Sequence, residues 1–210
     1  MPHDDFEIEP VKGLPELPPE GEHILWQGRP DAVALAREAL SLTWVALYFV
    51  VLAAWRAITL QPDVGWGEAI RAGSPFLIMG AGVCFVLWLF AYIQARATVY
   101  TITNRRVAMR IGAALNVTLN LPYRWIGSAD LRRGSGGTGT IALDLMGPVK
   151  LSYLVCWPHV RPWRIARPQP ALRCVPDAQK VADLLAEAAQ TRLTEQVMDR
   201  VREPAPVAAE

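Results

Sequence analysis

A glycine-rich stretch, GSGGTG at residues 134–139, has the spacing of a dinucleotide-binding motif. Such a motif binds phosphates where it follows a strand and opens a helix, because the backbone N–H groups at the helix start then face the phosphates. The residues that follow here, TIALDLM, read as a strand and not as a helix. The stretch is therefore predicted to be a hairpin turn, and no nucleotide site is expected.

The other side chains with catalytic or metal-binding potential are scattered. The chain has three histidines, at His3, His23 and His159, and three cysteines, at Cys84, Cys156 and Cys174. They show no ligand spacing, no CxxC pair and no nucleophile motif. Asp130 and Asp144 could meet in space, but two acids in a β-rich region are more often solvated strand ends. We expect no catalytic group, no metal site, no cofactor and no enzymatic activity.

Positive charge is concentrated in the second half of the chain. Residues 95–175 hold twelve bases against two acids, whereas the whole chain has a net charge of +1. Five of these arginines are candidates for a basic face: Arg105, Arg106, Arg110, Arg132 and Arg133. Beside a membrane, each base contributes about 1 kcal/mol of attraction to anionic headgroups. This basic face has three possible interpretations: it contacts an anionic lipid surface, it contacts a protein partner, or it is merely solvated. The near-neutral net charge of the whole chain and the acidic segments on either side of the basic region argue against nucleic-acid binding.

Two apolar stretches predict membrane-spanning helices. Residues 40–60 contain one charge, Arg56, and residues 75–94 contain none. A helix needs about 20 apolar residues to cross a hydrocarbon core of ~30 Å, and an arginine near one end can reach the headgroups. The predicted elements are a first transmembrane helix at 31–60 with Asp31 as its N-cap, a hairpin connection at 61–74 and a second transmembrane helix at 75–96.

The bases that flank the predicted spans set their orientation, since positive loops stay in the cytoplasm. Four arginines follow Gln94 within twenty residues, whereas the connection 61–73 holds one. We therefore expect a multi-pass protein with both termini cytoplasmic and the hairpin periplasmic. A homodimer stays open, because Gly80 and Gly82 permit close helix approach but do not form a GxxxG motif.

A third apolar region, at 141–158, is not expected to cross the membrane. Near its middle it contains Asp144, Gly147, Pro148 and Lys150, each costly or disruptive in a spanning helix. Its apolar residues form two short runs on either side of the Gly-Pro pair. The region is predicted to be two strands and a turn.

Beyond Ala97 the pattern predicts a small antiparallel β domain closed by an amphipathic helix. The predicted strands are 98–103, 106–112, 114–121, 125–131, 140–146 and 149–156, and the helix covers 177–201. A proline-rich connection separates the last strand from the helix. The domain boundaries are 97–203, with an acidic, proline-containing segment at 1–30 before the spans and a tail at 204–210.

Three strings resemble the bacterial PH-like (YdbT-type) domain: GEHILWQGRP, YTITNRRVAMRIG and LNLPYRWIGSADLRRGSGGTGTIAL. The whole chain resembles the assembly proteins of the photosynthetic reaction centre in purple bacteria. The resemblance implies an α+β membrane protein of the inner (intracytoplasmic) membrane, in which a two-span helical hairpin precedes the PH-like domain.

The same resemblance implies a non-enzymatic assembly factor. Its partners would be the subunits of the reaction centre and of the core antenna. The alternative is a membrane-anchored PH-like module that senses lipids or peptides and is unrelated to photosynthesis.

Overall fold

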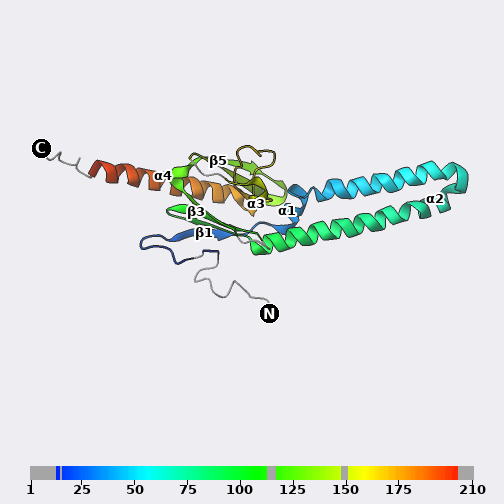
Figure 1. The fold of residues 1–210 in the computed structure, drawn as a ribbon, viewed down its shortest axis with the longest axis horizontal. Coiled ribbons are helices and arrows are strands. Elements are labelled where there is room, and N and C mark those ends of the chain that lie inside the picture. The colour runs from blue at the N-terminus through cyan, green and yellow to red at the C-terminus, as the bar shows by residue number, and fades with distance from the viewer. Residues whose placement is uncertain (1–12, 15, 113–116, 148–150, 203–210) are drawn as a thin grey trace. The chain divides into compact units, whose positions relative to one another are not determined.

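The computed structural model describes residues 13–202 apart from 15, 113–116 and 148–150 (Figure 1). The chain divides into two compact units. One, the helical unit, comprises Asp31–Arg96; the other, the β unit, comprises Met1–Pro30 together with Ala97–Glu210. Most of the predicted N-terminal segment before Gly13 and the tail at 204–210 lie outside the described residues.

The β unit is discontinuous in sequence. Strand β1 (Ile24–Gly28) pairs antiparallel with β2 (Val99–Thr103), so that Gly28 lies opposite Tyr100. The boundary predicted at residue 97 matches the start of the second part of the β unit, but the domain is not continuous, because it takes its first strand from the N-terminal segment. The helical unit is inserted between two neighbouring strands of one sheet.

The first sheet has the order β1-β2-β3-β4, with β3 at Arg106–Ile111 and β4 at Val117–Pro122. The turn predicted at Asn104–Arg105 joins β2 and β3. Because successive side chains point to opposite faces of a strand, Val107, Met109 and Ile111 enter the core. The intervening side chains of β3 lie on the outer face.

At β2 the outer face of the first sheet is also buried, which an isolated sheet would not achieve. Every residue of β2 is buried. Leu14 is 1% exposed. A Cβ atom added at Gly13 would lie 2.6 Å from Cγ1 of Val99. The N-terminal segment thus covers the outer face of β2.

The second sheet has the order β5-β6-β7. Its strands are β5 (Ile126–Arg133), β6 (Thr138–Leu145) and β7 (Ala171–Pro176). The strand predicted at 149–156 is wrong, since its described part contains the helical turn α3 (Tyr153–Cys156). The prolines around residues 171–176 predict an irregular connection, but the structure has strand β7 there. A strand at the edge of a sheet tolerates proline, because its nitrogen needs no hydrogen-bond partner in the sheet.

Helix α4 (Ala178–Arg202) confirms the predicted C-terminal helix. Its buried residues Val181, Leu185 and Ala188 join a core that also contains Met109 from the first sheet and Leu143 from the second. Two sheets and one closing helix therefore share a single apolar interior, as the PH-like arrangement predicts.

The helical unit begins with α1 (Ala32–Glu38), whose predicted N-cap Asp31 accepts a hydrogen bond from the N–H of Ala34 at 2.7 Å. The next helix, α2, spans Leu42–Ala97 and is interrupted at Gly65, where φ is 75° and ψ is 169°. The single helix predicted at 31–60 is thus divided near Ser41, where φ is 54°.

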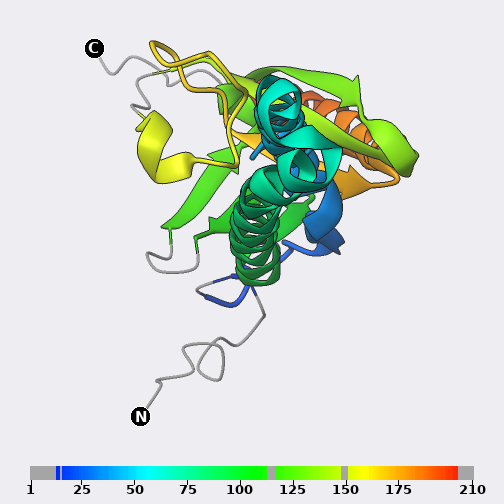
Figure 2. The same ribbon diagram turned by 90° about the vertical axis from the view of Figure 1, so that its right-hand side faces the viewer.

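The connection predicted at 61–74 is mostly helical. Gly65 adopts a positive φ without a steric penalty, so one residue turns the chain and its neighbours stay in the helix. A Cβ atom at Gly73 would lie 2.8 Å from the carbonyl oxygen of Ala53, and one at Gly80 would lie 2.6 Å from Cβ of Phe49. The two arms of α2 therefore lie side by side (Figures 1 and 2).

The described part of the chain contains one helix, α2, that is long and apolar enough to cross a membrane. In its most apolar window 11% of the residues are buried. The core helix of a soluble protein would be mostly buried. The apolar side chains of α2 are instead largely exposed.

Candidate functional site

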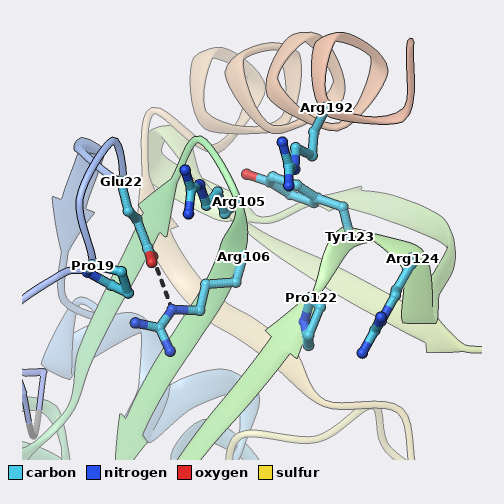
Figure 3. Close-up of a pocket in the computed structure, with 8 residues that line it drawn as sticks. All are labelled: Pro19, Glu22, Arg105, Arg106, Pro122, Tyr123, Arg124 and Arg192. Atoms are coloured by element: carbon cyan, nitrogen blue, oxygen red, sulfur yellow. Dashed lines mark hydrogen bonds and ion pairs between the residues drawn. The ribbon is translucent and has the colours of Figure 1, made fainter. Parts of the chain in front are cut away.

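Four arginines meet at one end of the β unit, around a cavity of about 250 Å³ (Figure 3). We call this cavity the arginine pocket. It is lined by Pro19, Glu22, Arg105, Arg106, Pro122, Tyr123, Arg124 and Arg192. These residues come from the N-terminal segment, the β2–β3 turn, the short 3₁₀ helix Tyr123–Trp125 and α4. Segments far apart in the sequence thus build one positively charged hollow.

Arg106 holds the N-terminal segment against the first sheet. Its Nε lies 2.8 Å from Oε1 of Glu22, whose side chain is 3% exposed. The hydroxyl of Thr103 also donates to this carboxylate, at 2.9 Å, and accepts the backbone N–H of Arg106 at 3.0 Å. The Glu22 carboxylate thus accepts hydrogen bonds from Arg106 and Thr103, so Arg106 has a structural role in the pocket.

Tyr123 forms the floor of the pocket. Burial raises the pKa of its phenol, and the negative charge of Glu22 raises it further. The phenol stays protonated and donates to the carbonyl oxygen of Thr103 at 2.6 Å. Tyr123 therefore positions the turn that carries Arg105 and cannot serve as a base.

The other three arginines are accessible to an external anion. Arg192 donates to Glu195 at 3.1 Å on the surface of α4, and Arg124 lies over the ring of Trp125. Arg105 and Arg124 form no ion pair within the described part of the chain. Figure 3 shows Arg192 reaching from α4 toward Arg105, whereas Arg124 points away from them. Guanidinium groups in such a hollow suit carboxylates or phosphates, which they bind through paired N–H donors.

The five arginines predicted as one basic face do not lie together. Arg105 and Arg106 line the pocket, but Arg110 is 4% exposed on the covered outer face of β3. Arg132 and Arg133 are exposed on β5, in the other sheet, and Arg133 donates to Gln179 of α4. As neighbours on a strand they point to opposite faces. The prediction of a single basic face is therefore wrong. Anion binding by Arg105 stays a prediction.

Sequence reasoning missed Arg124 and Arg192. Arg124 lies in the 3₁₀ turn after β4. Arg192 lies on α4, which begins about seventy residues after Arg106. No local spacing links these positions to Arg105. Their meeting depends on how α4 crosses the end of the first sheet, which sequence periodicity does not specify.

The glycine-rich stretch is the hairpin turn that the sequence predicts. Residues Ser135–Gly137 form the turn between β5 and β6, with φ of 70° at Gly136 and 80° at Gly137. The chain continues into a strand. The stretch therefore lacks the helix start that would bind a phosphate.

His159 is a buried structural residue. Its Nδ1 lies 2.7 Å from the hydroxyl of Tyr100, and its Nε2 lies 3.0 Å from the hydroxyl of Thr98. Tyr100 also accepts the backbone N–H of Arg173. Burial, followed by the positive charge of Arg173, lowers the pKa of His159 to about 3. The imidazole is thus a neutral link between β2 and the segment before β7.

The described residues contain no group of three His, Cys, Asp or Glu side chains that could hold a metal ion. Cys156 and Cys174 are buried, and burial raises the pKa of the Cys156 thiol. Asp130 and Asp144 are joined indirectly. Asp130 pairs with Arg161 at 2.8 Å, and Asp144 accepts from Gln169 at 2.9 Å. These two acids attach the 161–169 loop to the second sheet.

The discontinuous β unit and its inserted helices define the class. The chain matches the bacterial PH domain family over residues 32–189, and it belongs to that family. The match starts after β1, so the first strand lies outside it. The chain is 47% identical over 197 residues to a protein of Rhodobacter capsulatus described as an uncharacterized 23.7 kDa protein in the puhA 5′ region. That alignment covers 93% of this chain and 92% of the relative. No solved structure matches the chain significantly.

Proposed function

We propose that this chain is a PuhB-type assembly factor, anchored in the bacterial inner membrane, for the photosynthetic reaction centre and its core antenna. The observation that carries the proposal is the 47% identity, along almost the whole chain, to a protein of a photosynthetic bacterium that is named for its position next to puhA. The bacterial PH domain supports the architecture but does not specify the partner.

The pairing of β1 with β2 supports a hairpin that crosses the membrane twice. These strands flank the helical unit in the sequence, and they pair in one sheet. Both ends of the helical unit must then lie on the same side of any membrane. An even number of crossings satisfies this requirement, and a single crossing does not.

The length of α2 supports the same topology. At 1.5 Å per residue, a straight helix of this length would extend about 84 Å, nearly three times the ~30 Å hydrocarbon core. The break at Gly65 divides it into two arms, each long enough for one crossing. With the arginine bias toward the flanks, both termini are assigned to the cytoplasm.

The arginine pocket is the proposed contact for a partner. Arg105 and Arg124 offer guanidinium groups that no described carboxylate neutralises, and Pro19 and Pro122 give the hollow apolar walls. An acidic segment of a reaction-centre or core-antenna subunit has the complementary chemistry. The factor would act by holding newly made subunits and would form no covalent bond with them.

A deletion strain tests the function. Loss of the chain should lower the levels of reaction centre and core antenna several-fold and slow phototrophic growth. Respiratory growth should be unchanged, and the complexes that form should have normal spectra. Normal reaction-centre levels in this strain would contradict the proposal.

Complementation tests the pocket. A chain with Arg105→Gln and Arg124→Gln should restore the complexes poorly, whereas the matched control Arg132→Gln with Arg133→Gln should restore them fully. Both pairs remove two positive charges, but only the first pair lines the pocket. Equal rescue by the two variants would show that the pocket is not required for the assembly function.

The alternative function is a membrane-anchored module that binds lipid headgroups or peptides independently of photosynthesis. The arginine pocket favours it as well, because phosphates and carboxylates bind guanidinium groups in the same way. This alternative predicts that deletion causes no selective loss of photosynthetic complexes.

A further inference from the structure

The loop between β6 and β7 exposes large apolar side chains that the rest of the β unit does not cover. Trp163 is 89% exposed and Ile165 is 68% exposed. In the same connection, Leu154 of α3 is 84% exposed. A single exposed apolar side chain is common on a water-soluble domain, but several large ones in one connection between two strands indicate a surface with an apolar contact.

The base of this loop is firmly attached. Val160 forms a bridge with Pro170, and the N–H of Arg161 donates to the carbonyl oxygen of Gln169 at 2.9 Å. The guanidinium of Arg161 pairs with Asp130 of β5. The exposed tip is therefore held by the second sheet and does not trail as an unattached segment.

The tip carries its apolar residues in a strained but fixed arrangement. Trp163 has φ of 64°, in the left-handed region that bulky residues seldom occupy. Every residue from 163 to 167 is exposed. Such strain persists where the surroundings determine the backbone, and it is often found at functional positions. Here it presents the indole outward, away from the core.

The charge pattern of the tip identifies its partner. Arg164 and Arg167 alternate with the apolar residues, and neither pairs with a carboxylate in the described part of the chain. Tryptophan beside arginine is the composition of segments at the membrane–water interface, where indole rings occupy the headgroup region and guanidinium groups bind phosphates. A protein interface normally takes about 20–30 residues a side, far more than this tip offers.

We propose that the tip of the 161–169 loop inserts into the headgroup region of an anionic bilayer, with Trp163 and Ile165 as apolar anchors and Arg164 and Arg167 on lipid phosphates. The β unit then has a second membrane contact besides the helical unit. This inference rests on the proposed membrane anchoring, because the loop acts next to a membrane that α2 already occupies.

The test uses the full chain reconstituted into vesicles that contain phosphatidylglycerol. Cys84→Ala removes the cysteine of the helical unit, and Cys156 and Cys174 are buried. Ile165→Cys then receives an environment-sensitive fluorophore. Gln190→Cys, at an exposed position on α4, is the matched control. The background without either new cysteine measures labelling of the buried thiols.

The label at 165 should emit at shorter wavelength than the label at 190, and lipids with a nitroxide near the headgroup should quench it several-fold more. Arg164→Gln with Arg167→Gln, or pure phosphatidylcholine vesicles, should reduce this quenching. Similar emission and similar quenching by aqueous iodide at both positions would overturn the inference. A label shielded from iodide but not quenched by lipid would also overturn it, in favour of a protein contact.

Flotation of the vesicles separates this inference from the proposed anchoring. If the protein floats and resists extraction with alkaline carbonate but its label at 165 faces water, the proposed anchoring is retained and the proposed loop contact is overturned. Protein that does not float with the vesicles overturns both.

Discussion

The Glu22–Arg106 pair on the first sheet and the Asp130–Arg161 pair on the second have the same N–O distance, 2.8 Å. Their surroundings are opposite. The side chain of Glu22, in the N-terminal segment, is 3% exposed, whereas that of Asp130 is 58% exposed. The outer face of the first sheet is covered by the chain itself, and the outer face of the second is open to solvent at this pair.

This difference shows that geometry alone does not rank the two pairs. Removing one partner of a buried pair leaves an unpaired charge that water cannot reach, at a cost of about 3–5 kcal/mol. An exposed pair competes with water and salt and contributes about 0–1 kcal/mol. The first sheet should therefore depend on its polar contacts far more than the second.

The largest effect is expected when the cover of the first sheet is removed. A fragment of residues 97–203 lacks β1 and Glu22, so β2 becomes an open edge and Arg106 loses its partner. We expect poor dispersion in its amide NMR spectrum and no cooperative unfolding in urea.

Residues 13–30, joined to 97–203 by a short Gly/Ser linker, should restore both properties, because Gly28 lies opposite Tyr100 and the joined ends are neighbours. Cooperative unfolding of the 97–203 fragment alone would show that the cover is dispensable.

Glu22→Gln tests the buried pair by itself. The variant removes the negative charge and leaves Arg106, which is 25% exposed and can be partly hydrated, without its ion-pair partner, so the free energy of unfolding should fall by about 1.5–3 kcal/mol. Urea unfolding of the linked β unit measures it. Glu20→Gln, which changes an exposed carboxylate in the same segment, should leave the midpoint nearly unchanged. Equal effects of the two substitutions would refute the distinction between buried and exposed pairs.

His159 extends the comparison to a buried neutral group. Its pKa is about 3 in the folded state and about 6.5 in the unfolded state, so the unfolded state takes up the proton first as the pH falls. The free energy of unfolding should decrease below pH 6.5, by about 2 kcal/mol at pH 5, and continue to fall toward pH 3.

His159→Gln should be less stable at pH 7 but should lose less stability between pH 7 and pH 5 than the unsubstituted protein does. His23→Gln, at an exposed position, serves as the control and should keep the original slope. An unchanged slope in His159→Gln would assign the acid sensitivity to other groups.

Asp130→Asn should have the smallest effect, below about 1 kcal/mol in the free energy of unfolding. The bridge between Val160 and Pro170 still closes the loop, and Arg161 still donates to Gln169. High salt should reduce the small contribution of this pair further. A loss comparable to that of Glu22→Gln would mean that the second sheet also depends on its exposed polar contacts.

The elements built from local pattern could be predicted from the sequence. The turn at Asn104–Arg105, the glycine turn before β6 and helix α4 follow from turn residues and periodicity, and the structure contains all three. These features depend on residues within a few positions of one another, so the sequence records them directly.

The contacts between distant segments could not be predicted in this way. Strand β1 is short, and its partner lies about seventy residues further along, beyond the helical unit. Arg192 reaches the pocket only because α4 closes the β unit. Arg110 has the same sequence character as Arg105, yet it is 4% exposed. Charge counting recognised a basic region but could not tell which arginines face outward.

The insertion of the helical unit between β1 and β2 has a consequence for biosynthesis. The ribosome releases β1 first, but its partner strand emerges after both arms of α2 have been made. In the proposed two-span topology, insertion of only one arm would leave the two strands in different compartments, and the first sheet could not close. A closed first sheet is therefore incompatible with a hairpin that is half inserted, so the fold itself excludes that error before any partner is engaged.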